Sequence, residues 1–195
     1  MSFTHGPHEY GAIHFHDESV DDARWDKSFT LTVPEGLPSG VYAARLRVNR
    51  IASADTEDYI PFAVRPPKTG SKAKIALVLP IFSYMAYAND NLSVNSVIAQ
   101  LLTGQVPLLQ PGDLLLNKER GYGLGTYAHY RDGWGVNTSS RLRPIINMRP
   151  KYIHVLSPSL WQLNADLHIT DWLHEMGYDC DIHTDIDLQE EGVGL

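Results

Sequence analysis

The first third of the chain alternates apolar and polar side chains, which is the pattern of half-buried β-strands. Residues 28–33 place Phe, Leu and Val on one face and Ser and Thr on the other. Residues 41–48 alternate in the same way, and residues 58–64 form a third candidate strand. Pro61 predicts an edge position or a bulge for that strand, because proline cannot donate to a sheet ladder. We therefore expect antiparallel strands with one buried face.

The pattern changes after a polar stretch rich in proline and glycine. Residues 74–80 form a continuous apolar run, which is typical of a strand buried on both faces of a parallel sheet. Apolar side chains then recur at helical spacing from Leu163 to Met176, and Gly177 follows as a helix terminator. Residues 178–183 resemble the next strand. A strand, a helix and a second strand in this order predict a doubly wound α/β domain.

A helix is expected after that second strand, with Asp185 as its N-cap. The chain thus divides into a β-sandwich-like portion over residues 1–66, a linker over residues 67–73, and the first part of an α/β domain over residues 74–195. The predicted sandwich has too few strands to cover its apolar face. We expect the chain to be an internal piece of a larger subunit, which exposes sheet edges and aggregates when it is expressed alone.

A long insertion separates the first parallel strand from its crossover helix. It spans roughly 80 residues, where an ordinary connection takes about 2–6. It leaves the carboxyl end of the strand, which is where open α/β sheets bind their ligands. It also holds six of the ten tyrosines, namely Tyr84, Tyr87, Tyr122, Tyr127, Tyr130 and Tyr152.

Composition excludes several classes of protein. With 43% apolar residues the chain is too apolar to be disordered, and its net charge of −7 argues against nucleic-acid binding. No apolar run is long enough to span a membrane, and the N-terminus has no signal-peptide pattern. We therefore expect a cytoplasmic protein that contacts neither membrane nor nucleic acid. The single Cys180 excludes an internal disulfide and every site of the CxxC type.

Common catalytic motifs are absent from the sequence, including GxSxG, HExxH, the P-loop and a complete GxGxxG. Cys180 lies between two aspartates, which raise a thiol pKa, so we interpret it as structural and not as a nucleophile. His14 and His16 could bind a metal from one strand face, with His5 and His8 nearby, but solvent-facing histidines explain them as well. The basic cluster of Arg141, Arg143, Arg149 and Lys151 suits positioning or subunit contacts better than phosphate binding.

The tyrosines of the insertion could simply pack as half-buried side chains. Five sequence blocks, however, resemble the large (beta) subunit family of N,N-dimethylformamidase, in order and over nearly the whole chain. These blocks are residues 25–46, 58–67, 84–89 (YMAYAN), 140–144 (SRLRP) and 160–166 (LWQLNAD).

The resemblance implies an α/β domain similar to class I glutamine amidotransferases, preceded by β-sandwich material and lacking the cysteine nucleophile. It also implies a mononuclear ferric iron, Fe(III), held by two tyrosines and one glutamate. Tyr87 and Tyr127 match the tyrosine ligands, with Tyr84 and Tyr130 as the second choices. The glutamate belongs to a His-Pro-Glu-Tyr-Trp-like motif, which this sequence lacks, since Glu175, Glu190 and Glu191 do not match it. We expect this third ligand beyond Leu195.

Phenolate ligands suit a hard trivalent cation. A free tyrosine titrates near pKa 10, so ionising it at pH 7 requires about 4 kcal/mol of differential stabilisation, which a bound cation supplies. The activity implied by the resemblance is hydrolysis of a small N-substituted amide to carboxylate and amine, with a small helical subunit and self-association in the full-length protein. Two alternatives stay open: a non-catalytic β/α binding or structural module, and a fragment that is inactive on its own.

Overall fold

The structure is a computed structural model that describes residues 4–6, 16, 19–47, 57–68, 70–90, 96–150 and 152–192. Its helices and strands follow one another in a mixed α/β order. They are β1 (Gly40–Arg47), β2 (Glu57–Val64), β3 (Ile75–Leu79), α1 (Ile81–Ala86), α2 (Ser96–Thr103), α3 (Pro111–Lys118), β4 (Ile153–His154), β5 (Ser159–Leu160), α4 (Leu163–Glu175), β6 (Cys180–Thr184) and α5 (Asp185–Glu191), with 3₁₀ turns at Arg120–Tyr122 and Ile146–Met148.

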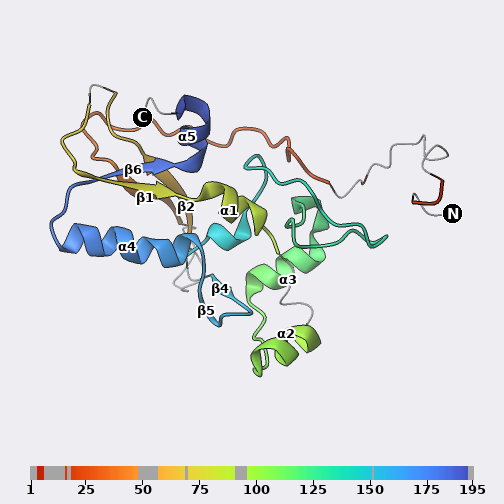
Figure 1. The fold of residues 1–195 in the computed structure, drawn as a ribbon. Coiled ribbons are helices and arrows are strands. Elements are labelled where there is room, and N and C mark those ends of the chain that lie inside the picture. Colours follow the sequence, from red (N-terminus) through yellow and green to blue (C-terminus); the bar gives the residue numbers. More distant parts are fainter. Residues whose placement is uncertain are drawn as a thin grey trace.

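The described strands form three two-stranded sheets. β1 pairs antiparallel with β2, β4 pairs antiparallel with β5, and β3 pairs parallel with β6. The α4 helix makes the crossover between β3 and β6, and Figure 1 shows it running along β1 and β6, with α2 and α3 to one side. The predicted antiparallel strands, the parallel pair and the crossover helix are therefore confirmed. The described residues form only two-stranded sheets, so neither the expected sandwich nor the expected doubly wound sheet is confirmed.

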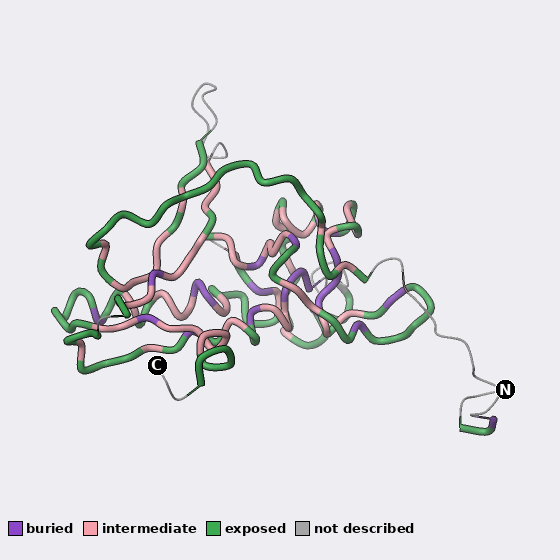
Figure 2. The backbone as a smooth tube through the Cα atoms, turned by 90° about the horizontal axis from the view of Figure 1, so that it is seen from above, coloured by how far each residue is buried: buried purple, intermediate pink, exposed green. Residues whose placement is uncertain are grey.

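One hydroxyl joins the hairpin to the parallel pair. The Ser39 side chain accepts a hydrogen bond from the Ile182 backbone N–H at 2.7 Å and donates one to the Val64 carbonyl at 2.9 Å. Next to this junction the core gathers the buried residues Leu79, Tyr84, Leu163 and Ile182. Figure 2 shows that buried chain lies mostly in the middle of the molecule, with exposed chain around it.

Two predictions about burial were wrong. Residues 28–33 form no strand, and Phe29 and Leu31 are each 52% exposed. Alternating apolar and polar residues form a strand only when a neighbouring strand provides hydrogen-bond partners for the backbone. No described strand pairs with this segment. β3 is also not covered on both faces: Ile75 and Val78 are exposed, whereas Leu79 is 2% exposed. β6 is its sole partner among the described strands, and a lateral partner shields the edge of a strand but not its faces.

The end of α4 matches its prediction, and the start of α5 differs by one residue. Gly177 follows α4 with a φ of 72°, a left-handed conformation that glycine adopts without steric cost. The N-cap of α5 is Thr184, whose hydroxyl accepts the Asp187 N–H at 3.2 Å, and not Asp185. The Asp185 carboxylate instead accepts the Phe82 N–H at 3.0 Å and so stabilises the start of α1.

A buried asparagine holds the insertion together. Asn89 is 1% exposed and has a positive φ of 57°, which asparagine tolerates better than most residues. Its side-chain carbonyl accepts the Ile146 N–H at 2.9 Å, and its amide donates to the Pro144 carbonyl at 2.8 Å. The amide also lies 3.2 Å and 3.3 Å from the carbonyls of Tyr122 and Gly123. Three separated segments of the insertion thus meet at one side chain.

The turn at Gly125 approaches the chain around Asn89 closely. A Cβ at Gly125 would lie 2.8 Å from the Ala88 carbonyl oxygen and 3.2 Å from the Asp90 nitrogen. Both contacts are with backbone, which cannot rotate away as a side chain can. Glycine is therefore required here by lack of space.

No helix among the described residues has the length and apolar character needed to cross a membrane.

We predict that Asn89→Ala lowers the free energy of unfolding by about 1–3 kcal/mol, because it leaves buried backbone groups without partners. Asn89→Gly removes the same hydrogen bonds but relieves the positive φ, so it should still destabilise. The exposed Asn117→Ala is the matched control and should have little effect. Urea unfolding measures all three, and equal midpoints for Asn89→Ala and Asn117→Ala would contradict the structural role.

We predict that Gly125→Ala destabilises the protein by about 1–3 kcal/mol, because the added methyl group must push two backbone segments apart. Gly121→Ala is the control, since a Cβ at that position meets nothing within 4 Å. Thermal unfolding compares the two variants. Equal melting temperatures for Gly125→Ala and Gly121→Ala would show that this close approach does not exist in solution.

Candidate metal centre

Tyr87 lies at the end of the first helix of the α/β portion. The α1 helix follows β3 directly and turns Tyr84 inward, and Tyr87 is its C-cap, with its backbone N–H bonded to the Ser83 carbonyl at 3.3 Å. The side chain of Tyr87 is half-buried. Tyr87 thus follows the end of β3 by eight residues, at the far end of α1.

Two hydrogen bonds bring Tyr127 to the same place. The backbone N–H and the hydroxyl of Thr126 both donate to the Ala86 carbonyl, at 3.0 Å and 2.7 Å. The Tyr127 ring then stacks on the Tyr87 ring with centroids 4.3 Å apart and planes 13° from parallel. The structure thus places side by side two tyrosines that lie 40 positions apart in the sequence.

The neighbouring Tyr127 side chain raises the pKa of Tyr87 above its ordinary value. Desolvation and the negative charge of Asp90 act in the same direction. Without a cation Tyr87 therefore stays phenolic at neutral pH. Two adjacent phenolic oxygens at a half-exposed edge form a hard donor set, so the residues present fit a trivalent metal ion such as iron.

The second-choice tyrosines have other partners. Tyr84 is 1% exposed, and its hydroxyl donates a short hydrogen bond to the Asp166 carboxylate on α4. Burial, followed by that carboxylate, raises the pKa of Tyr84. Tyr130 is 6% exposed in a cluster with Leu124 and Val136, and it stacks on His16 at 3.9 Å. Both side chains pack within the fold and are not part of the stacked pair.

A polar cluster that sequence reasoning did not identify lies beside the pair. Trp161 meets Tyr87 edge-on, with ring centroids 6.1 Å apart, and His154 stacks on Trp161 at 4.5 Å. The Asp90 carboxylate lies 3.9 Å from His154 Nε2 and accepts the Tyr152 hydroxyl at 3.1 Å. Desolvation lowers the pKa of His154, while burial raises the pKa of Tyr152. The only signal in the sequence was that Trp161 lies in the family-like block at residues 160–166.

The remaining candidates have structural partners or lie outside the described part of the chain. Cys180 begins β6, and burial raises the pKa of its thiol, as expected for a structural cysteine. The buried Arg143 donates to the Leu124 carbonyl, and Arg149 pairs with Asp58 of β2 at 3.0 Å, so both have the expected positioning role. His8, His14 and Lys151 lie outside the described residues.

No three His, Cys, Asp or Glu side chains of the described ranges gather closely enough to hold a metal. Of the glutamates considered, Glu191 pairs with Arg65 at 2.8 Å. The stacked tyrosines are therefore the strongest metal-binding candidates among the described residues, and the third ligand stays a prediction.

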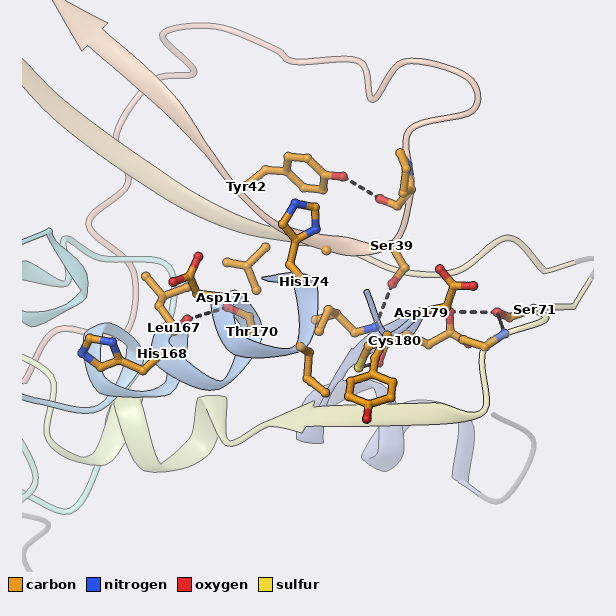
Figure 3. A pocket seen from close by; sticks show the side chains of 18 of the residues that line it. Ser39, Tyr42, Ser71, Leu167, His168, Thr170, Asp171, His174, Asp179 and Cys180 are labelled. Carbon is orange, nitrogen blue, oxygen red and sulfur yellow. Dashed lines mark hydrogen bonds between the residues drawn. The ribbon is translucent and has the colours of Figure 1, made fainter. Parts of the chain in front are cut away.

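A separate cavity of about 930 Å³ lies between β1, α4, β6 and the linker. Figure 3 shows Ser39 and Tyr42 facing His174 of α4 across it, with Cys180 at one side. None of the four candidate tyrosines lines this cavity. Its polar side chains come from the junction between the hairpin and the crossover helix.

Comparison with known proteins gives a family match and two similar relatives. Residues 2–195 match a family described as N,N-dimethylformamidase beta subunit-like, C-terminal. The chain is 45% identical to the N,N-dimethylformamidase beta subunit of Paracoccus aminophilus and 44% identical to that of an Alcaligenes species, in both cases over all 195 residues. It spans about a quarter of the length of these relatives, since the matches cover 25% of each. By these matches, the chain belongs to the N,N-dimethylformamidase beta subunit-like family.

Proposed function

We propose that this chain supplies two tyrosine ligands of a ferric iron centre in an amidohydrolase that cleaves small N-substituted amides. The observation that carries the proposal is the stacked pair of Tyr87 and Tyr127, which places two phenols side by side. The names of the two relatives support dimethylformamide as the first substrate to assay. The third ligand is a glutamate outside residues 1–195.

The bound ion supplies Lewis acidity, which polarises an amide carbonyl and makes it easier to attack. The protein residues do the rest. Tyr87 and Tyr127 would hold the ion as phenolates, each having released its phenolic proton to solvent. The rings of Tyr127 and Trp161 contact the Tyr87 ring, one stacked and one edge-on, and orient it.

The proposal extends to architecture and assembly. The parallel pair β3–β6 with its crossover helix supports an amidotransferase-like α/β domain, and the hairpin β1–β2 supports preceding β-sandwich material. The relatives are named beta subunits, which supports assembly with a second, smaller subunit. The apolar side chains of α2 are highly exposed, with Leu101 at 79% and Leu102 at 70%, and are available for such a contact.

We predict that Tyr87→Phe and Tyr127→Phe each lose iron, the tyrosinate-to-iron absorption band and amide hydrolysis in the full-length protein. Each variant removes one anionic ligand and leaves the ring stack in place. Tyr178→Phe is the matched control, because Tyr178 is also about half exposed but packs against Trp172. Metal analysis and absorption spectra decide the matter: full iron content and activity in both ligand variants would overturn the assignment.

We predict that Tyr84→Phe keeps the iron and its absorption band. It lowers the free energy of unfolding by about 1–3 kcal/mol, because the Asp166 carboxylate loses its buried donor. Iron content and urea unfolding measured on the same preparation separate the two effects. Loss of the absorption band with unchanged stability would make Tyr84 a ligand in place of Tyr87.

A further inference from the structure

A ladder of four aromatic rings connects the tyrosine pair to the interior. Tyr127 stacks on Tyr87, and Tyr87 meets Trp161 edge-on with their planes at 83°. Trp161 in turn stacks on His154, with planes 20° apart. Such contacts favour defined ring orientations beyond the area that they bury. The orientation of Tyr87 is thus coupled to rings on a different part of the chain.

The buried end of the ladder is fixed by hydrogen bonds. His154 is 3% exposed, and its Nδ1 accepts the Leu156 N–H at 3.3 Å. The proton of the neutral ring therefore resides on Nε2, which faces the Asp90 carboxylate at 3.9 Å. The Asp90 carboxylate is held in turn by the Tyr152 hydroxyl.

A backbone hydrogen bond also joins Asp90 to Tyr87. The Asp90 N–H donates to the Tyr87 carbonyl at 3.2 Å, so Tyr87 and Asp90 belong to one turn. The Tyr87 ring is therefore contacted by Trp161, which is itself contacted by His154, while its backbone is joined to the turn that carries Asp90.

The segment that carries Trp161 is attached to the same region. The neighbouring Gln162 donates to the Ser83 carbonyl of α1 at 3.1 Å and accepts the Asn147 side-chain amide at 3.0 Å. Asn147 also accepts the Asn89 N–H at 3.3 Å. The indole is thus fixed relative to the helix that ends at Tyr87.

We propose that Trp161 and His154 are positioning residues that orient the Tyr87 phenol toward Tyr127. Neither touches the reacting atoms; they act through Tyr87. The consequence for iron rests on the proposed function, whereas the orientation of Tyr87 does not require iron. The two parts are therefore tested separately.

The first measurement uses iron-free, full-length protein with 3-fluorotyrosine incorporated only at position 87, followed by ¹⁹F NMR. Trp161→Leu should shift and broaden the resonance, because the ring loses its edge contact. Trp161→Phe should restore most of the original position. Trp172→Leu removes an exposed tryptophan that packs on Tyr178 and should leave the resonance unchanged. An unshifted resonance in folded Trp161→Leu protein overturns the proposal.

His154 gives a second, independent pair of variants. His154→Phe keeps a ring against Trp161, and His154→Leu does not, so we expect a larger shift of the Tyr87 resonance in His154→Leu. Equal spectra in these two variants would contradict the role of His154. If Trp161→Leu does not fold, the comparison of His154→Phe with His154→Leu still tests whether these rings orient Tyr87.

The iron measurement is competition of the full-length protein with a ferric chelator. Trp161→Leu should weaken iron binding about 10–100-fold, as expected when a neighbour that orients a ligand is lost, and Trp161→Phe should recover most of it. Unchanged affinity in Trp161→Leu, together with an unshifted resonance, refutes the positioning role. A wild-type protein that binds no iron refutes the proposed function alone, because the NMR result still decides the orientation of Tyr87.

Discussion

The buried side chain of Asn89 is the constraint on which the tyrosine pair depends. It binds backbone groups of two segments that are far apart from it and from each other in the sequence, and it lies two residues after Tyr87. Gly125 fits against the same turn only because it has no side chain. Thr126 then donates a hydrogen bond to the Ala86 carbonyl, and the next residue, Tyr127, lies beside Tyr87. A long insertion, entropically costly to order, is thus organised around one amide.

This arrangement separates two kinds of tyrosine. Tyr84 and Tyr152 donate to carboxylates, and burial of the two tyrosines keeps them phenolic. Tyr87 and Tyr127 instead stack on each other in a partly exposed place, with no carboxylate hydrogen-bonded to either among the contacts of the described residues. The difference is one of environment, since the residue type is the same. The aromatic contacts of Trp161 and His154 then orient one member of the pair.

The sequence predicted the elements whose pattern is local. The hairpin β1–β2, the parallel strands β3 and β6 and the crossover helix all follow from periodicity and from Gly177. It failed at residues 28–33, where alternation has no partner strand, and at β3, where burial depends on neighbours. The tyrosine candidates came from a family resemblance. Their stacking, and the cluster of Asp90 and His154, depend on contacts that periodicity does not encode.

Resonance Raman spectroscopy of the purified full-length protein, excited within its visible absorption band, tests the central claim most directly. Our account predicts bound ferric iron with enhanced tyrosinate ring vibrations that change when either Tyr87 or Tyr127 is labelled at its phenol oxygen. Iron without tyrosinate vibrations, or tyrosinate vibrations unaffected by labelling these two residues, would contradict it.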